Sequence, residues 1–133
     1  MEQRPRILLV DDEPDFIETM SFWLKAKGYP VTSAENGIKA LEILQQGQQD
    51  VVFLDVNMPH MDGIEVLRNI RKFNPTLPVI MVTAAFQDEV KFSEAKALGI
   101  SGFFPKGTSL SQLGNVLEVA LRTLRPSSTN PPV

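Results

Sequence analysis

Hydrophobic residues along the chain gather into short continuous runs separated by segments with helical spacing. Three runs are apolar throughout, at residues 7–10, 51–54 and 79–82. Continuous rather than alternating hydrophobicity predicts central strands of a parallel sheet that is covered on both faces. Two weaker runs, 31–34 and 102–104, are short and mixed in polarity, which predicts strands at the edges of the sheet.

Between these runs, apolar residues recur every three or four positions, the spacing of an amphipathic helix. The less regular segment 87–98 is also expected to be helical. Strand and helix thus alternate five times, which predicts an α/β fold: a flavodoxin-like (βα)5 three-layer sandwich with a five-stranded parallel sheet in the order 2-1-3-4-5. Glycines that end a helix cheaply with positive φ are expected at Gly28, Gly47 and Gly99.

The length of 133 residues fits one domain with a single core. A hydrophobic share of 43% and a charged share of 22% are those of a soluble globular protein and argue against a disordered chain. We expect a domain over residues 1–125 and a flexible tail, or the start of a linker, over 126–133. The reason is that this closing stretch, rich in proline and serine, cannot form a packed element.

Charge and cysteine content narrow the range of functions. Thirteen Lys and Arg against sixteen Asp and Glu give a net charge of -3, so we expect no direct binding of nucleic acid. No apolar run is long enough to span a bilayer and the N-terminus lacks a secretory apolar stretch. We therefore expect no membrane partner and a cytoplasmic location. Because the chain has no cysteine, disulfides and thiolate metal sites are excluded.

Acidic residues directly follow two of the buried runs. Asp11, Asp12 and Glu13 come after the first expected strand, and Asp55 comes after the third. In the expected sheet these strand ends meet where the winding direction reverses, which is the usual ligand site of such folds. Crowded carboxylates repel one another and favour a divalent cation, and oxygen ligands suit magnesium. Each acid alone has an ordinary explanation, as a helix cap or a solvated loop residue.

Two further polar residues follow the other strands at the same edge of the sheet. Thr83 ends the fourth strand, and Lys106 follows the fifth. A hydroxyl and an ammonium in this place can receive the oxygens of a phosphoryl group. Separately they are an ordinary strand-end residue and an ordinary surface lysine. Together with three aspartates they indicate phosphoryl chemistry.

These motifs resemble those of the receiver domains of bacterial response regulators. The resemblance covers residues 6–124, nearly the whole chain. Its most specific motif is Val-Phe-Leu-Asp-Val-Asn-Met-Pro at 52–59, followed by Met-Asp-Gly at 61–63. The other motifs are Ile-Leu-Leu-Val-Asp-Asp-Glu at 7–13, Val-Ile-Met-Val-Thr-Ala at 79–84 and Gly-Phe-Phe-Pro-Lys at 102–106.

The resemblance implies a phosphorylation-activated signalling switch of a two-component system. Asp55 would be the phosphoacceptor, taking a phosphoryl group from a sensor histidine kinase or a histidine phosphotransfer protein. Mg²⁺, or Mn²⁺, would be bound by Asp12 and Asp55 directly, by the backbone carbonyl of Asn57, and by Asp11 through water. Such a domain is not an enzyme with an external substrate, since it catalyses only its own phosphorylation and dephosphorylation.

The same resemblance implies how the phosphoryl group is sensed. Lys106 would pair with one phosphoryl oxygen, Thr83 would hydrogen-bond another, and the amide of Ala84 would assist. In this family the threonine moves toward the phosphate and an aromatic residue of the fifth strand turns inward, and Phe103 matches that position. Alternatively, Phe103 belongs to the fixed core, with Phe104 as its counterpart on the other face. Both interpretations stay open.

The loop after the phosphoacceptor contains residues with expected structural roles. Pro59 and Gly63 are expected to shape this loop, because proline fixes φ and glycine permits unusual backbone angles. His60 is the chain's one histidine. We expect it to be a loop side chain rather than a phosphorelay histidine.

The partners beyond a phosphoryl donor stay open: an attached output domain, a separate target protein, or a second copy of the chain. Dimerisation through the fourth helix, fifth strand and fifth helix is common among receivers. The leucine stripe of the last helix is nevertheless expected to pack in the core.

The chain departs from the family pattern around the lysine. Receivers usually carry a proline directly after it, commonly joined by a cis peptide, whereas here Gly107 follows Lys106 and Pro105 precedes it. We expect a trans bond between Phe104 and Pro105 and a turn that is built differently. One extra residue is expected in the loop 85–87.

Three other functions fit parts of the pattern. A phosphatase of the haloacid-dehalogenase type needs a second acid two residues after its nucleophile, where this chain has Asn57. A flavodoxin-like FMN module needs neutral donors after the first strand rather than acids. The serious alternative is a phosphorylation-independent interaction domain with the receiver fold, which the altered lysine turn keeps open.

Overall fold

The protein forms a three-layer α/β sandwich around one parallel sheet. The computed structural model describes residues 4–83 and 89–129, and from residue 123 onward it describes only the course of the backbone. Five strands pair in the order β2-β1-β3-β4-β5, which confirms the predicted topology. The strands are β1 (Ile7–Val10), β2 (Val31–Ala34), β3 (Val51–Asp55), β4 (Val79–Thr83) and β5 (Gly102–Pro105).

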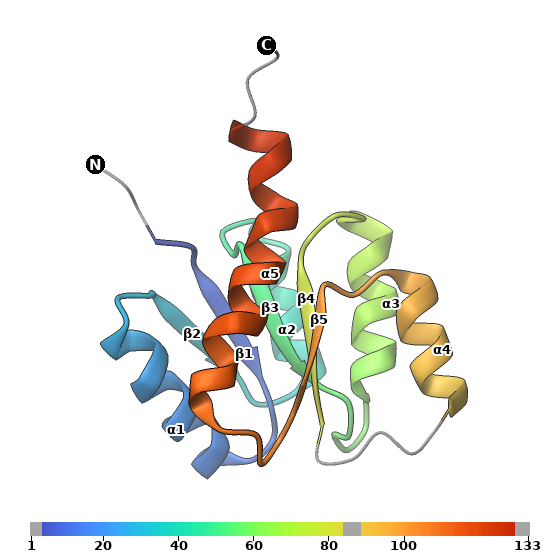
Figure 1. Ribbon diagram of the computed structural model, residues 1–133. Helices are drawn as coiled ribbons and strands as arrows, with labels where there is room; N and C mark the ends of the chain where they lie inside the picture. The colour runs from blue at the N-terminus through green and yellow to red at the C-terminus, as the bar shows by residue number, and fades with distance from the viewer. Residues whose placement is uncertain (1–3, 84–88, 130–133) are drawn as a thin grey trace.

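Five helices alternate with the strands and cover both faces of the sheet (Figure 1). α1 and α5 lie on one face, and α2, α3 and α4 lie on the other. This arrangement divides the core into two layers, one on each side of the sheet. The helices are α1 (Pro14–Ala26), α2 (Gly37–Leu44), α3 (Gly63–Phe73), α4 (Glu89–Leu98) and α5 (Leu110–Thr129).

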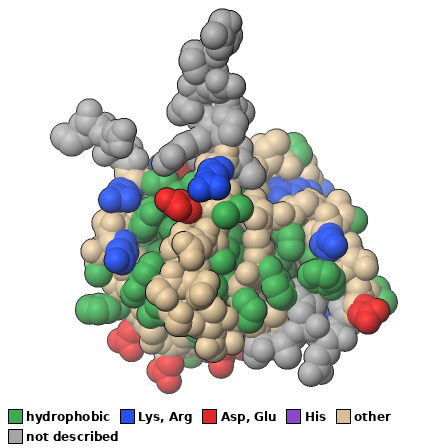
Figure 2. Space-filling model, in the orientation of Figure 1, with side chains coloured by type: hydrophobic (Ala, Val, Ile, Leu, Met, Phe, Trp, Pro, Cys, Tyr) green, Lys and Arg blue, Asp and Glu red, His purple; other side chains and the backbone are tan. Residues whose placement is uncertain are grey.

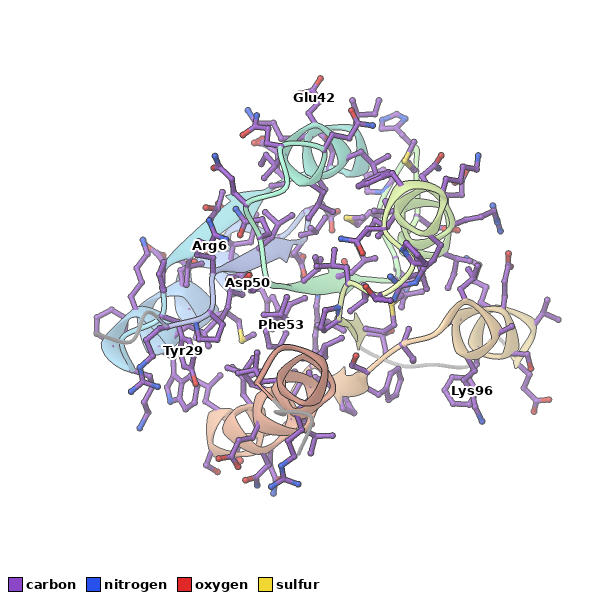
Figure 3. The ribbon with its side chains drawn as sticks, turned by 90° about the horizontal axis from the view of Figure 1, so that it is seen from above. Arg6, Tyr29, Glu42, Asp50, Phe53 and Lys96 are labelled. Atoms are coloured by element: carbon purple, nitrogen blue, oxygen red, sulfur yellow. The ribbon has the colours of Figure 1, made fainter. Side chains whose placement is uncertain are left out.

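The three apolar runs form the centre of the sheet, as predicted. Every residue of β1, β3 and β4 is buried, whereas the edge strands β2 and β5 are partly exposed. Figure 3 shows Phe53 pointing from β3 toward α5, where it joins the core layer that α1 and α5 cover. At the opposite end of β3 from the acidic residues, Arg6 donates to Asp50 Oδ2 from its backbone N–H, at 2.8 Å, and from Nε, at 3.3 Å.

The helix ends follow local sequence signals. Pro14 opens α1, where its missing N–H leaves no hydrogen bond unmade. Asp62 caps α3 in a capping box: its side chain accepts from the Glu65 N–H, and the Glu65 carboxylate accepts from the Asp62 N–H. The glycines expected to end helices, Gly28, Gly47 and Gly99, have φ angles of 96°, 74° and 89°.

The last helix differs from the expected end of the domain. α5 extends to Thr129, past residue 126, where we expected a tail that forms no packed element. The division into a domain and a tail or linker remains a prediction. The expected leucine stripe is confirmed as core, because Leu113, Leu117 and Leu121 are buried. Among the described residues, no helix combines the length and apolarity needed to cross a bilayer.

Candidate functional site

Three aspartates meet at the carboxyl ends of the two central strands. β1 and β3 pair in parallel with Val10 opposite Leu54, so the residues that follow these two positions lie side by side. Asp11 and Asp55 are buried, with 2% and 3% of their surface exposed, whereas Asp12 is exposed. Carboxylate oxygens of these three residues all lie within 4.8 Å of one another. The predicted acidic cluster is therefore formed.

Lys106 reaches into this cluster from the end of β5. Its ammonium lies 3.0 Å from Asp11 Oδ2 and 3.7 Å from Asp55 Oδ2, and it also forms an ion pair with Glu13. The Lys106 backbone N–H donates to the Thr83 carbonyl at 2.6 Å, which fixes the start of the turn against β4. The altered turn around the lysine thus still brings its side chain to the aspartates.

Thr83 and Asn57 lie next to the acidic residues at the end of β4 and after β3. Thr83 ends β4 and is buried, with 1% of its surface exposed. The Asn57 side-chain amide donates to Thr83 Oγ1 at 3.5 Å, and the Asn57 backbone N–H donates to Asp55 Oδ1 at 3.3 Å. Ala84, whose amide we expected to contact a phosphate, lies outside the described residues, as does the loop 85–87.

A hollow of about 270 Å³ opens over this cluster and gives a small ligand access to it. Figure 2 shows acidic side chains along the lower edge of the molecule, where the strands end. This volume is too small for a drug-sized organic ligand and suits an ion with a phosphoryl group. The hollow is lined by Asp12, Glu13, Asp55, Asn57 and Lys106.

Burial and like charge shift the pKa values of the buried acids upward. Burial and the neighbouring charge of Asp11 raise the pKa of Asp55 to about 7, although Lys106 and the Asn57 N–H act in the opposite direction. Burial also raises the pKa of Asp11, against the lowering effect of the hydrogen bond from the Glu13 N–H. For Lys106, burial lowers the pKa, but its pairing with Glu13 and Asp11 outweighs burial and leaves the pKa above its usual value.

The donor set fits a hard divalent cation. The buried Asp11 Oδ2 has the Lys106 ammonium 3.0 Å away as its ion-pair partner, and the same ammonium lies 3.7 Å from Asp55 Oδ2. One ammonium faces three aspartates and Glu13, so the described site carries excess negative charge. Carboxylate oxygens with room for water are the ligands that Mg²⁺ and Mn²⁺ take. A cation at this place would relieve the crowding of negative charge.

Two residues near the lysine were not predicted to be its partners. Glu13 pairs with the Lys106 ammonium, and the Phe16 ring lies beneath it, with Nζ 4.7 Å from the ring centroid. Glu13 stands in the acidic run and Phe16 follows three positions later, on the same side of the first turn of α1. This three-residue spacing indicated that the two side chains lie close together, but it did not indicate that both contact Lys106.

The two phenylalanines of β5 point to opposite faces of the sheet. Phe104 is buried in the layer covered by α1 and α5. Phe103 is half-buried on the other side, where its ring meets Phe92 of α4 edge-on, with 5.9 Å between centroids and 63° between planes. The bond between Phe104 and Pro105 is trans, as expected. A switching role for Phe103 stays a prediction.

The loop after Asp55 holds His60 as a loop side chain with a φ of 73°, in agreement with the expectation. Gly63 requires a correction. It lies at the start of α3 and is not among the described glycines with positive φ, so it is not needed for an unusual backbone angle. A Cβ at Gly63 would instead lie 2.2 Å from the Asp55 carbonyl oxygen, so the residue is needed for space.

The crowding of carboxylates predicts that Asp55→Asn stabilises the metal-free domain at pH 8, by on the order of 1–3 kcal/mol. The folded-state pKa of Asp55, about 7, lies above its ordinary value of 3.8. The wild type therefore loses stability as the pH rises through this window, and the variant lacks that loss. The gain should shrink at pH 5. Urea denaturation in EDTA at both pH values measures it, and a variant less stable than wild type at pH 8 would contradict it.

Comparisons with known proteins agree with this geometry. Residues 7–118 match the model of the response regulator receiver domain. The response regulator MprA of a Mycobacterium species (strain KMS) is 34% identical over 121 residues, which cover 91% of this chain and 52% of that protein. The chain thus spans about half the length of this curated relative.

Solved structures show the same fold. The chemotaxis protein CheY4 of Vibrio cholerae has a TM-score of 0.78 and 33% identity, covering 86% of this chain and 97% of that one. The response regulator protein TrrA of Thermotoga maritima, solved in complex with Mg²⁺ and BeF, has a TM-score of 0.77 and 30% identity, covering 87% and 98%. The chain belongs to the response regulator receiver domain family of two-component systems.

Proposed function

We propose that this receiver domain accepts a phosphoryl group on Asp55 from a phosphohistidine of a sensor kinase or phosphotransfer protein, and acts as a phosphorylation-activated switch. The observation that carries the proposal is the burial of the Asp55 carboxylate beside two further aspartates and one lysine, under an open hollow. An ionised acid in such a place destabilises the folded domain through charge repulsion. A functional role, binding a cation and accepting a phosphoryl group, explains why an acid occupies this destabilising position.

In the proposed reaction, an oxygen of the ionised Asp55 attacks the phosphorus of the phosphohistidine. An O–P bond forms, the P–N bond breaks, and the bond's electron pair leaves with the imidazole. Lys106, whose ammonium lies 3.7 Å from Asp55 Oδ2, offsets the charge on the phosphoryl oxygens. The high pKa of Asp55 means that a neighbouring positive charge must favour the ionised nucleophile.

Asp12, Asp55 and the backbone carbonyl of Asn57 would hold Mg²⁺ or Mn²⁺ directly for this step, and Asp11 would hold it through water. Bound there, the cation would neutralise charge on the acids and on the phosphoryl oxygens. The close set of aspartate oxygens and the excess negative charge of the site support this assignment. The complex of TrrA with Mg²⁺ and BeF is consistent with it.

The proposed output is a conformational change sensed by Thr83, the Ala84 amide and Phe103. Thr83 is buried behind Asn57, which lines the hollow and donates a hydrogen bond to the Thr83 hydroxyl. A phosphoryl group on Asp55 would compete for this hydroxyl and so favour a second arrangement. An output domain, a target protein or a second copy would read that arrangement. The matched stretch makes up 52% of MprA, which supports control of an attached output domain.

Intact mass after incubation with acetyl phosphate and Mg²⁺ tests the proposal. We expect one phosphoryl adduct on the wild type and none on Asp55→Asn or in EDTA. Asp50→Asn is a matched control, because Asp50 precedes the same strand at its far end and pairs with Arg6 instead of the site. This variant should be phosphorylated like the wild type.

The opposite result would be a folded wild type that gains no adduct and shows no Mg²⁺-dependent binding of beryllofluoride. The second measurement matters because rapid hydrolysis can hide an adduct, whereas beryllofluoride does not hydrolyse in this way. Failure in both would overturn the proposal in favour of a receiver fold that binds its partners without phosphorylation.

A further inference from the structure

The turn that carries Lys106 does little to fix the orientation of the Lys106 side chain. Gly107, with a φ of 91°, follows the lysine, and a Cβ placed on Gly107 would meet no atom within 4 Å. The backbone of Lys106 is fixed by one hydrogen bond to Thr83. A flexible four-carbon stem extends from there to the acidic cluster, so the position of the ammonium must be set by groups outside the turn.

Three carboxylates attract this ammonium in different directions. Asp11 and Asp55 are buried at the floor of the hollow, whereas the Glu13 side chain at the rim is 60% exposed. The ammonium bridges Asp11 and Glu13, so the ion pairs alone draw it toward the rim as well as toward the floor. Only at the floor does it face the oxygens of a phosphoryl group on Asp55.

The ring of Phe16 lies under the ammonium and gives it a contact from a further direction. Lys106 Nζ is 4.7 Å from the ring centroid, within the range of a cation–π contact. The ring is partly buried against the core layer of α1 and α5, so its place is fixed by packing. The Lys106 side chain is only 15% exposed, which strengthens an electrostatic contact of this kind.

We propose that Phe16 is a positioning residue for phosphoryl acceptance, because its ring holds the Lys106 ammonium over Asp11 and Asp55. The ring thus orients the Lys106 side chain, which Gly107 does not do because it has no side chain to pack against the lysine. This inference rests on the proposed function for its effect on rate, and on geometry alone for the contact itself.

The contact is tested first in the metal-free protein by NMR. A ring under the ammonium shifts the ε-methylene protons of Lys106 upfield through its ring current. We expect this shift in the wild type, its loss in Phe16→Leu and its retention in Phe16→Tyr. Phe22→Leu makes the same change on the same helix at a side chain that is 77% exposed, and it should leave the Lys106 signals unchanged. Wild-type signals at ordinary lysine positions would overturn the inference, whatever the protein does with phosphate.

The effect on phosphorylation is tested by a double-mutant cycle. With acetyl phosphate and Mg²⁺, we expect Phe16→Leu to slow adduct formation roughly twofold to tenfold, the range that cation–π contacts support. Phe16→Tyr should retain most of the rate, because it keeps the ring. In a Lys106→Met background, Phe16→Leu should change nothing further, because the ring has no ammonium left to hold.

If Phe16→Leu slowed adduct formation equally in the wild-type and Lys106→Met backgrounds, the ring would serve only packing and the positioning role would be rejected. A wild type without any adduct, but with the upfield Lys106 signals, would reject the proposed function and leave the contact established. The two failures are therefore distinguishable.

Discussion

Replacing Gly63 with alanine is expected to destabilise the domain by about 3 kcal/mol and to slow phosphorylation of Asp55. A Cβ at this position would lie 2.2 Å from the Asp55 carbonyl oxygen and 2.9 Å from Val56 Cα. Both neighbours are backbone atoms, which cannot rotate away as the end of a side chain can. The Gly63 N–H also donates to the Val56 carbonyl at 2.9 Å, so the start of α3 and the end of β3 must move together.

Gly114→Ala is the matched control for this change. Gly114 lies within α5, and a Cβ there would be 3.7 Å from the Trp23 ring, an ordinary contact. Because alanine loses less conformational freedom in a helix, this variant should equal or exceed the wild type by about 0.5–1 kcal/mol. Urea denaturation of both variants gives the comparison. A Gly63→Ala variant as stable as Gly114→Ala would show that β3 and α3 separate without loss.

Gly63 also illustrates what sequence could not supply. Its place in the motif after Asp55 marked it as structurally important, but the expected reason, an unusual backbone angle, was wrong. Contact between a helix start and the end of a strand depends on how the two elements pack. That distance is not encoded in local propensity, so no pattern along the chain reveals it.

The fold was predictable because the central strands are buried on both faces. Such burial demands continuous apolar runs, and these appear in the sequence without interruption. The helix α4 was harder to predict, because Ala95 is its only buried residue among those described. A helix that buries so little carries a weak periodic signal.

The acidic site was predictable for a geometric reason. Parallel strands end at one edge of a sheet, so residues directly after them must meet there. Asp11, Asp55 and Thr83 satisfy this rule. The contact between Phe16 and Lys106 does not, since a long side chain meets a helix from a different part of the chain. Its direction depends on rotamers that sequence alone leaves undetermined.

The second large effect on stability is expected at Arg71, a basic residue of α3 that is not part of the acidic site. The guanidinium of Arg71 is half-buried and donates to four backbone carbonyls of three segments. Nε donates to Leu98 at 2.9 Å, Nη2 donates to Leu77 at 2.9 Å and to Gly99 at 2.6 Å, and Nη1 donates to Asn74 at 2.9 Å. It thereby joins the end of α3, the approach to β4 and the end of α4.

Arg71→Met should therefore destabilise the domain by about 3 kcal/mol, because a group of similar length without donors leaves the carbonyls of Leu98, Asn74 and Leu77, whose contacts are partly buried, without a donor. Arg71→Lys should recover only part of the loss, since one ammonium cannot reach all four acceptors. Burial lowers the pKa of Arg71, but an arginine keeps its charge at any ordinary pH. Urea denaturation gives the loss, and hydrogen exchange should show faster opening at the end of α4.

Arg68→Met is the control, because Arg68 lies one turn earlier on α3 and also reaches α4, where it pairs with Glu94 at the surface. Surface ion pairs of this kind contribute little, so this variant should stay close to the wild type. If Arg68→Met lost as much stability as Arg71→Met, the number of contacts between α3 and α4 would decide stability. A loss confined to Arg71 would instead show that its hydrogen bonds to these four carbonyls hold α4 against the domain, on the same side of the sheet as Phe103.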